Sequence, residues 1–148
     1  MQTTLWEFEH AVECDADQFF AWSYWTDVSN WEKLEGEAVD WIRLYGPFAL
    51  GTNGATKMPG QEPQDWIISE LEPERFATIK MPLGEVVFYN RISFDSVSGH
   101  KTKITQRMML EGKEASNLVD GMRMFEQTAP QGLAKLASAI EVAFQMLP

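Results

Sequence analysis

The chain has 148 residues, the size of one domain with a substantial hydrophobic core. Apolar residues make up 45% of it and charged residues 23%, which excludes an intrinsically disordered or collagen-like chain. The 22 acidic and 12 basic side chains give a formal net charge of −10, so a phosphate backbone is repelled and nucleic-acid binding is not expected.

A reduced, cytoplasmic protein is expected from the N-terminus and the single cysteine. Residues 1–4 carry neither the basic stretch nor the apolar run of a signal peptide, and Cys14 has no partner for an internal disulfide. No apolar run reaches the roughly 20 residues of a membrane helix, so no membrane insertion is expected. Nucleotide-binding loops, nucleophile elbows and metal-spaced Cys or His clusters are also missing from the sequence, so we expect no cofactor and no metal.

The first predicted element is a half-buried strand from Leu5 to Cys14, because side chains of two kinds alternate along it. One side of this strand is largely apolar and carries Trp6, Phe8, His10, Val12 and Cys14. The other side is acidic and is interpreted as solvated. Two short helices are expected next, within residues 15–25 and 26–34, and Asp15 and Asp17 are interpreted as capping residues of the first.

Six further strands are expected to follow, because period-two segments alternate with turns rich in Pro, Gly and Ser. Short connections between them favour antiparallel pairing of successive strands. The predicted strands span residues 39–45, a stretch beginning at 49–52, and residues 66–71, 75–81, 86–94 and 102–110.

A long amphipathic helix is predicted at the C-terminus, since apolar residues recur every three or four positions from Leu118 to Leu147. Pro130 lies inside this pattern, where it removes one backbone hydrogen bond, so we expect a kink or a restart near Ala129.

Several short motifs lie along this order of elements and together cover nearly the whole chain. They comprise Trp6-Glu7-Phe8-Glu9-His10, Trp22 with Asp27-Val28-Ser29-Asn30-Trp31, Tyr45-Gly46-Pro47-Phe48 with Gly51-Thr52, Ile68-Ser69-Glu70-Leu71-Glu72-Pro73, Met108 with Glu111-Gly112, and Pro130, Leu133 and Leu136. On these motifs the chain resembles the START-like superfamily, also called SRPBCC, in particular its polyketide cyclase/dehydrase and lipid-transport branch. The resemblance implies a single domain over residues 1–148 with an α+β helix-grip fold. In that fold a curved antiparallel sheet of about seven strands wraps around a long C-terminal helix, with two short helices after the first strand.

The resemblance further implies a cavity for an apolar molecule between the sheet and the long helix. The matching motifs consist of turn and packing residues, so they specify a scaffold and supply no catalytic set to carry over. From strand and helix periodicity we expect the apolar lining to include Trp6, Phe8, Phe88, Met108, Met122, Phe125 and Leu133.

Three polar side chains are expected on the same inner face of the sheet: His10, Asn90 and Gln106. A buried polar group without a partner costs on the order of 1–3 kcal/mol, so each must bond to a neighbour, to water or to a ligand. Satisfaction by neighbours or water is the favoured interpretation. In the alternative the three bind or polarise a ligand oxygen, with His10 as the candidate acid or base.

Other chemistry-bearing residues favour structural interpretations. Trp22, Trp25, Trp31 and Trp41 are placed near the cavity mouth, where packing is favoured over a platform for a flat ligand. Arg43 is expected at the surface rather than buried against an acidic ligand group. Cys14 is expected to be a buried small residue and His100 an exposed one.

The leading functional hypothesis is binding of a small hydrophobic molecule, lipid-like or aromatic and polyketide-like, by a monomer or homodimer. One alternative is a cofactor-independent cyclase or dehydratase that uses the same cavity, with His10 as its acid or base. A protein-interaction module of the co-chaperone-like kind is the third possibility, because an acidic exterior suits a protein partner.

Overall fold

The computed structural model describes residues 3–113 and 117–148. Its strands form one seven-stranded antiparallel sheet in the order β1-β7-β6-β5-β4-β3-β2. The strands are β1 (Thr3–Cys14), β2 (Trp41–Leu44), β3 (Asn53–Lys57), β4 (Gln64–Glu72), β5 (Phe76–Leu83), β6 (Val86–Ser98) and β7 (Lys101–Gly112). The helices are α1 (Gln18–Thr26), α2 (Ser29–Glu35), a 3-10 turn η1 (Gly36–Ala38), α3 (Asn117–Arg123) and α4 (Phe125–Gln145).

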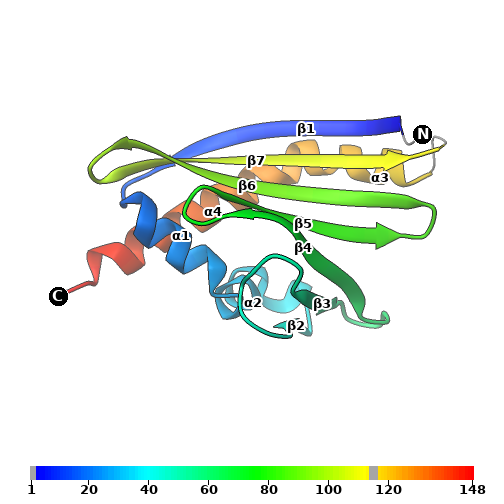
Figure 1. Cartoon of the computed structure of the whole chain (residues 1–148), viewed down its shortest axis with the longest axis horizontal. Coiled ribbons are helices and arrows are strands. Elements are labelled where there is room, and N and C mark those ends of the chain that lie inside the picture. Colours follow the sequence, from blue (N-terminus) through cyan, green and yellow to red (C-terminus); the bar gives the residue numbers. More distant parts are fainter. Residues whose placement is uncertain (1–2, 114–116) are drawn as a thin grey trace.

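The long helix α4 lies across one face of the sheet, with α1 and α2 beside it (Figure 1). Successive strands from β2 to β7 pair as hairpins, while β1 pairs with the last strand, β7, and thereby places the start of β1 beside the end of β7. This arrangement confirms the predicted helix-grip fold with two short helices after the first strand.

The alternation of β1 is also confirmed, because Trp6 and Cys14 are buried while Glu7, Glu9 and Glu13 are exposed. Asp17 is the N-cap of α1, and its Oδ1 accepts a hydrogen bond of 2.7 Å from the Phe20 N–H. The capping role expected for Asp15 is wrong: its N–H donates to Glu141 Oε2 at 2.7 Å and its carboxylate lies 3.8 Å from Lys101 Nζ. Asp15 therefore ties the start of α1 to α4 rather than capping a helix.

Three strand boundaries differ from the sequence expectation. Residues 49–52 form a turn and not the start of a strand, because Gly51 has a φ of +88° and its N–H donates to the Ile68 carbonyl at 2.8 Å. Strand β5 continues through Pro82 and Leu83, and the chain reverses only at Gly84, whose φ is +69°. Strand β6 likewise extends to Ser98, beyond the end predicted at residue 94, because its pairing with β7 continues to Ser98 opposite Lys101.

The C-terminal helix is interrupted, but not where Pro130 predicted. The break falls at Met124, and α4 continues through Pro130 as one helix without a restart near Ala129. Gly121 in the last turns of α3 weakens the helix there, and the Met124 carbonyl accepts hydrogen bonds from the N–H groups of both Gln127 and Thr128 as α4 begins. Pro130 lies close to the start of α4 and costs it one hydrogen bond, which the packed helix tolerates.

Candidate functional site

A cavity of about 690 Å³ lies between the inner face of the sheet and the helices. Its walls come from α1 and α2, from strands β2 to β7, and from α3 and α4. Most of its lining is apolar, including Trp25, Trp31, Leu34, Val39, Ile42, Trp66, Ile79, Met81, Leu83, Phe88, Ile92, Met108, Met122, Phe125, Ala129, Leu133 and Leu136. The polar side chains among its lining are Glu35, Thr56, Asn90, Gln106, Thr128 and Lys135.

Seven of the ten residues predicted for the site line this cavity: Phe88, Asn90, Gln106, Met108, Met122, Phe125 and Leu133. Strand alternation and helix periodicity bring them together from β6, β7, α3 and α4. Their contact with a ligand stays a prediction, because the geometry shows only that they share one cavity.

The other three predicted residues, Trp6, Phe8 and His10, lie on the inner side of β1 and are not part of the cavity lining. Their rings follow one another along the strand, with centroids 6.4 Å apart from Trp6 to Phe8 and 5.3 Å apart from Phe8 to His10. Trp6 is held against α4 by a hydrogen bond of 2.8 Å from its Nε1 to Glu126 Oε2. Alternation placed these side chains on the correct face, but α4 covers this edge of the sheet.

His10 is nevertheless connected to the cavity by hydrogen bonds. Its Nε2 donates to Gln106 Oε1 at 2.7 Å, and Gln106 Nε2 donates to Asn90 Oδ1 at 3.0 Å. The three side chains come from neighbouring strands, since His10 faces Gln106 across β1 and β7 and Gln106 is adjacent to β6. The three expected polar side chains are thus joined in one series of hydrogen bonds, and its two amides, Gln106 and Asn90, line the cavity.

The tryptophans expected near the cavity mouth divide into two pairs. Trp25 and Trp31 line the cavity and stack on each other with centroids 5.4 Å apart. Trp22 instead packs edge-on against Phe94, and Trp41 lies under the guanidinium of the exposed Arg43 at 4.0 Å. The surface position expected for Arg43 is therefore confirmed.

Strands β2 to β5 contribute a wall that was not proposed from the sequence. Trp66 is the largest side chain of that wall, and it fits because the residue opposite it is Gly54. A Cβ at Gly54 would lie 2.3 Å from the Trp66 ring, so only glycine admits this close approach. The alternation of β5 was a usable signal for the neighbouring Ile79 and Met81, since both share parity with the buried Ala77.

Cys14 carries no nucleophilic chemistry here. The thiol is fully buried, and its Sγ donates to the Ala137 carbonyl of α4 at 3.6 Å. Burial, together with the negative charges of Glu141 and Asp15, raises the pKa of Cys14 to about 12. The thiol therefore stays protonated at neutral pH, as a structural residue does.

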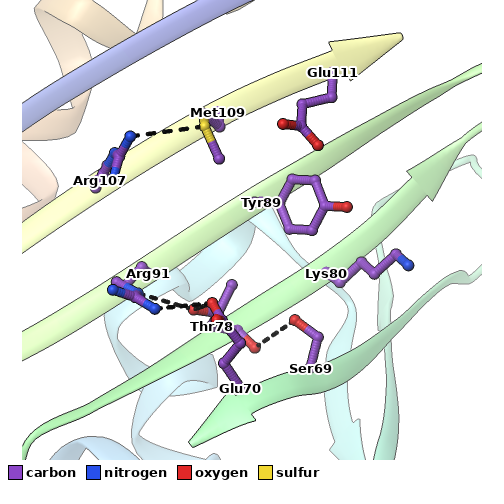
Figure 2. Close-up of a pocket in the computed structure, with 9 residues that line it drawn as sticks. All are labelled: Ser69, Glu70, Thr78, Lys80, Tyr89, Arg91, Arg107, Met109 and Glu111. Atoms are coloured by element: carbon purple, nitrogen blue, oxygen red, sulfur yellow. Dashed lines mark hydrogen bonds and ion pairs between the residues drawn. The ribbon is translucent and has the colours of Figure 1, made fainter. Parts of the chain in front are cut away.

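A second hollow, of about 500 Å³, lies on the outer face of the sheet (Figure 2). It is polar, and its arginines already have partners: Arg91 Nη2 lies 2.9 Å from Glu70 Oε1, and Arg107 Nη2 lies 2.8 Å from Glu7 Oε1. A hydrogen bond from Thr78 and the nearby Arg91 hold the pKa of Glu70 below its usual value, although burial opposes them. These ion pairs occupy both arginines of the hollow.

Within the described ranges 3–113 and 117–148, no three His, Cys, Asp or Glu side chains gather in a way that could hold a metal ion. In the same part of the chain, no helix has the length and apolar character needed to cross a membrane.

Comparisons with known proteins support the fold. No family model and no curated protein sequence matches the chain. Norcoclaurine synthase from Thalictrum flavum, in a complex with dopamine and hydroxybenzaldehyde, superposes with a TM-score of 0.74 at 17% identity over 99% of this chain and 90% of that one. An aromatase/cyclase from Streptomyces sp. R1128 gives 0.70 at 12% identity over 95% and 94%, and Ara h 8.0201 gives 0.70 at 11% over 91% and 97%. These likenesses confirm the helix-grip fold predicted from the START-like resemblance.

Proposed function

We propose that this protein binds a small, mostly apolar molecule in the cavity between the sheet and α4. The observation that carries the proposal is the cavity itself: at about 690 Å³ it lies within the range of roughly 300–1,000 Å³ typical of small-molecule sites. Its apolar and aromatic walls with few polar groups match the usual composition of such sites. An aromatic or lipid-like body of modest size suits this lining.

Packing energetics support the same conclusion. Protein interiors are close-packed, with few voids larger than a water molecule, and loss of packed volume is destabilising. The cavity leaves apolar side chains such as Trp66, Met108 and Leu133 without packing contacts on one side. Its cost is offset when a ligand restores the missing contacts.

Native mass spectrometry of the purified protein, with an organic extract analysed in parallel, tests the proposal directly. We expect either a copurified apolar molecule or saturable binding of the neutral probe N-phenyl-1-naphthylamine at one site per chain. A clean apo mass together with no probe binding would refute the proposal.

A cavity-filling variant locates the binding. Gly132 lines the cavity, and a Cβ there meets nothing within 4 Å, so Gly132→Phe can place a ring in the space that the ligand would occupy. Gly121→Phe is the matched control, since Gly121 is equally open and helical but does not line the cavity. Probe affinity should fall at least about 10-fold in the first variant and stay near that of the native protein in the second.

A cyclase or dehydratase reaction in the same cavity is the second candidate. The specific observation favouring it is the hydrogen bond from His10 to Gln106, which brings a titratable ring within one side chain of the cavity. Incubation with dopamine and hydroxybenzaldehyde, the pair in the norcoclaurine synthase complex, is a first assay for turnover. An enzyme that depends on His10 should lose turnover in His10→Gln while retaining ligand affinity, whereas a carrier shows no turnover in either form.

A further inference from the structure

The side-chain hydrogen bonds that link His10, Gln106 and Asn90 form a series in which each donor lies on the β1 side of its acceptor. Gln106 Oε1 can only accept, so His10 Nε2 carries the proton of the 2.7 Å hydrogen bond. The other end of the same amide, Gln106 Nε2, donates to Asn90 Oδ1 at 3.0 Å. Gln106 thus accepts from His10 on its β1 side and donates to Asn90 on its β6 side.

Asn90 is the last side chain in this series of hydrogen bonds, and its amide N–H group is a free donor. Its Oδ1 is occupied by Gln106, and the described residues supply no acceptor for its Nδ2. In this part of the chain no fully buried side-chain nitrogen or oxygen lacks a partner, so Asn90 Nδ2 is accessible from the cavity that Asn90 lines. An amide N–H with no acceptor, surrounded by Phe88 and Ile92 of the same strand, is therefore presented to whatever fills the space.

We propose that Asn90 selects ligands that carry an acceptor oxygen, such as a carbonyl, on an apolar body, and that Gln106 and His10 are positioning residues for this contact. The inference rests on the proposed function, because it names the ligand class of the same cavity. Asn90 Nδ2 binds the oxygen, Gln106 fixes the orientation of the Asn90 amide, and His10 fixes that of Gln106.

Because the hydrogen bonds all run in one direction, a substitution at position 10 is expected to reverse which ligands Asn90 selects. A carboxylate at position 10 accepts hydrogen bonds but cannot donate one, so it would turn the Gln106 amide until Nε2 faces β1. Gln106 Oε1 would then accept from Asn90 Nδ2, and Asn90 would present its Oδ1 to the cavity. A change on β1, outside the cavity lining, is expected to convert the donor in the cavity into an acceptor.

Two probes of nearly equal shape test the selection: 2-acetonaphthone, which carries a carbonyl oxygen, and 2-isopropenylnaphthalene, which carries a methylene group in its place. Titration followed by quenching of tryptophan fluorescence gives both affinities. The native protein should bind the ketone about 5-fold more tightly than the hydrocarbon, the effect of one net hydrogen bond.

Three variants, one at Asn90 and two at His10, test the series of hydrogen bonds. Asn90→Leu should abolish the preference, so that the ketone and the hydrocarbon bind with equal affinity. His10→Glu should invert it, so that the hydrocarbon binds more tightly than the ketone. His10→Gln can still donate to Gln106, so it should retain the native preference for the ketone. It serves as the matched control for position 10.

The outcomes separate this inference from the proposed function. If the native protein binds both probes equally, donor selection is refuted while cavity binding stands. If neither probe binds, both the proposed function and the inference fail. If His10→Glu weakens both probes in parallel, with their ratio unchanged, His10 has only a structural role and its assignment as a positioning residue is overturned.

Discussion

The two halves of α4 cover the same sheet but enclose different spaces. Toward the C-terminus, Ile140 and Ala137 belong to one buried cluster with Cys14, Phe94 and Ile104. Toward the N-terminus, Ala129 and Gly132 of the same helix face the cavity. One element thus contributes both to a closed core and to the wall of a site.

Side-chain volume accounts for the difference. At the closed end, α1 adds Trp22 and Phe20 to the rings of Phe94 and Phe144, so large side chains fill the angle between helix and sheet. At the open end, small residues of α4 lie where such rings would be needed. Stability is therefore expected to depend on the closed end and binding on the open one.

The largest expected effect comes from truncating a phenylalanine at the closed end. Phe94 is fully buried, so Phe94→Ala should lower the free energy of unfolding by about 3–5 kcal/mol, measured by urea denaturation. Phe125, a cavity-lining ring that is 39% exposed, is the matched site at the open end, and its truncation should cost below about 1 kcal/mol while weakening the binding of N-phenyl-1-naphthylamine. Equal losses of stability would contradict the division.

An alkaline pH dependence is expected from the closed end, where Cys14 is buried. The folded-state pKa of Cys14, about 12, lies above its ordinary value of 9.0, so the folded protein holds its thiol proton where the unfolded chain has lost it. The stability it contributes is complete below pH 9 and declines as the pH rises toward 12, by about 1.4 kcal/mol per pH unit. Subtracting the pH profile of Cys14→Ala, which keeps all other titrating groups, isolates this slope. A constant difference between the two profiles would show that the thiol is not shielded.

Thr102 tests the same closed end of α4 with a smaller expected loss of stability. Its buried hydroxyl donates to the Ala16 carbonyl at 2.8 Å, and Thr102→Val leaves that carbonyl without its partner. We expect a loss of about 1–2 kcal/mol in unfolding free energy. Thr105→Val, on the outward side of the same strand, is the control and should change stability by less than about 0.5 kcal/mol.

The smallest effect is expected at neither end but on the outer face. The pKa of Glu70 is lowered, so its contribution is present above its ordinary value of 4.5 and is lost as the pH falls through the folded-state value. Because the pair with Arg91 is partly exposed, Glu70→Gln should cost below about 1 kcal/mol at pH 7, with a difference from the native protein that shrinks in acid. Persistence of the full difference at pH 3 would assign the effect to packing instead.

The fold could be predicted from the sequence because its signals are local. Alternation in β1, the Asp17 cap and the apolar stripe of α4 each reflect a period or a hydrogen bond within a few residues. The misplaced helix break shows the limit of such rules. Proline removes one hydrogen bond, but α4 continues through Pro130 and the break falls at Met124, three residues after Gly121.

The candidate site could be predicted only in part, because its composition depends on how far each strand lies from the helix. Parity alone placed Asn90 and Gln106 on the correct face, and both line the cavity. The same parity placed Trp6 and Phe8 there too, yet the bond from Trp6 to Glu126 of α4 closes that edge. The opposite wall around Trp66 was missed because it needs the close approach to Gly54, a pairing between two strands that no single strand reveals.

The first strand is also the rim of an open sheet, since β1 pairs on one side only. Such a rim is a template on which further chains can add, the first step of aggregation into fibrils. Glu7, Glu9 and Glu13 recur along it, and the register of β1 shifts between Thr4 and Trp6. Arg107 and Lys101 lie beside Glu7 and Glu13, so the charge left for a second copy to meet on this rim is mainly that of Glu9. Together with the irregular ladder, this charge is expected to disfavour the addition of another strand.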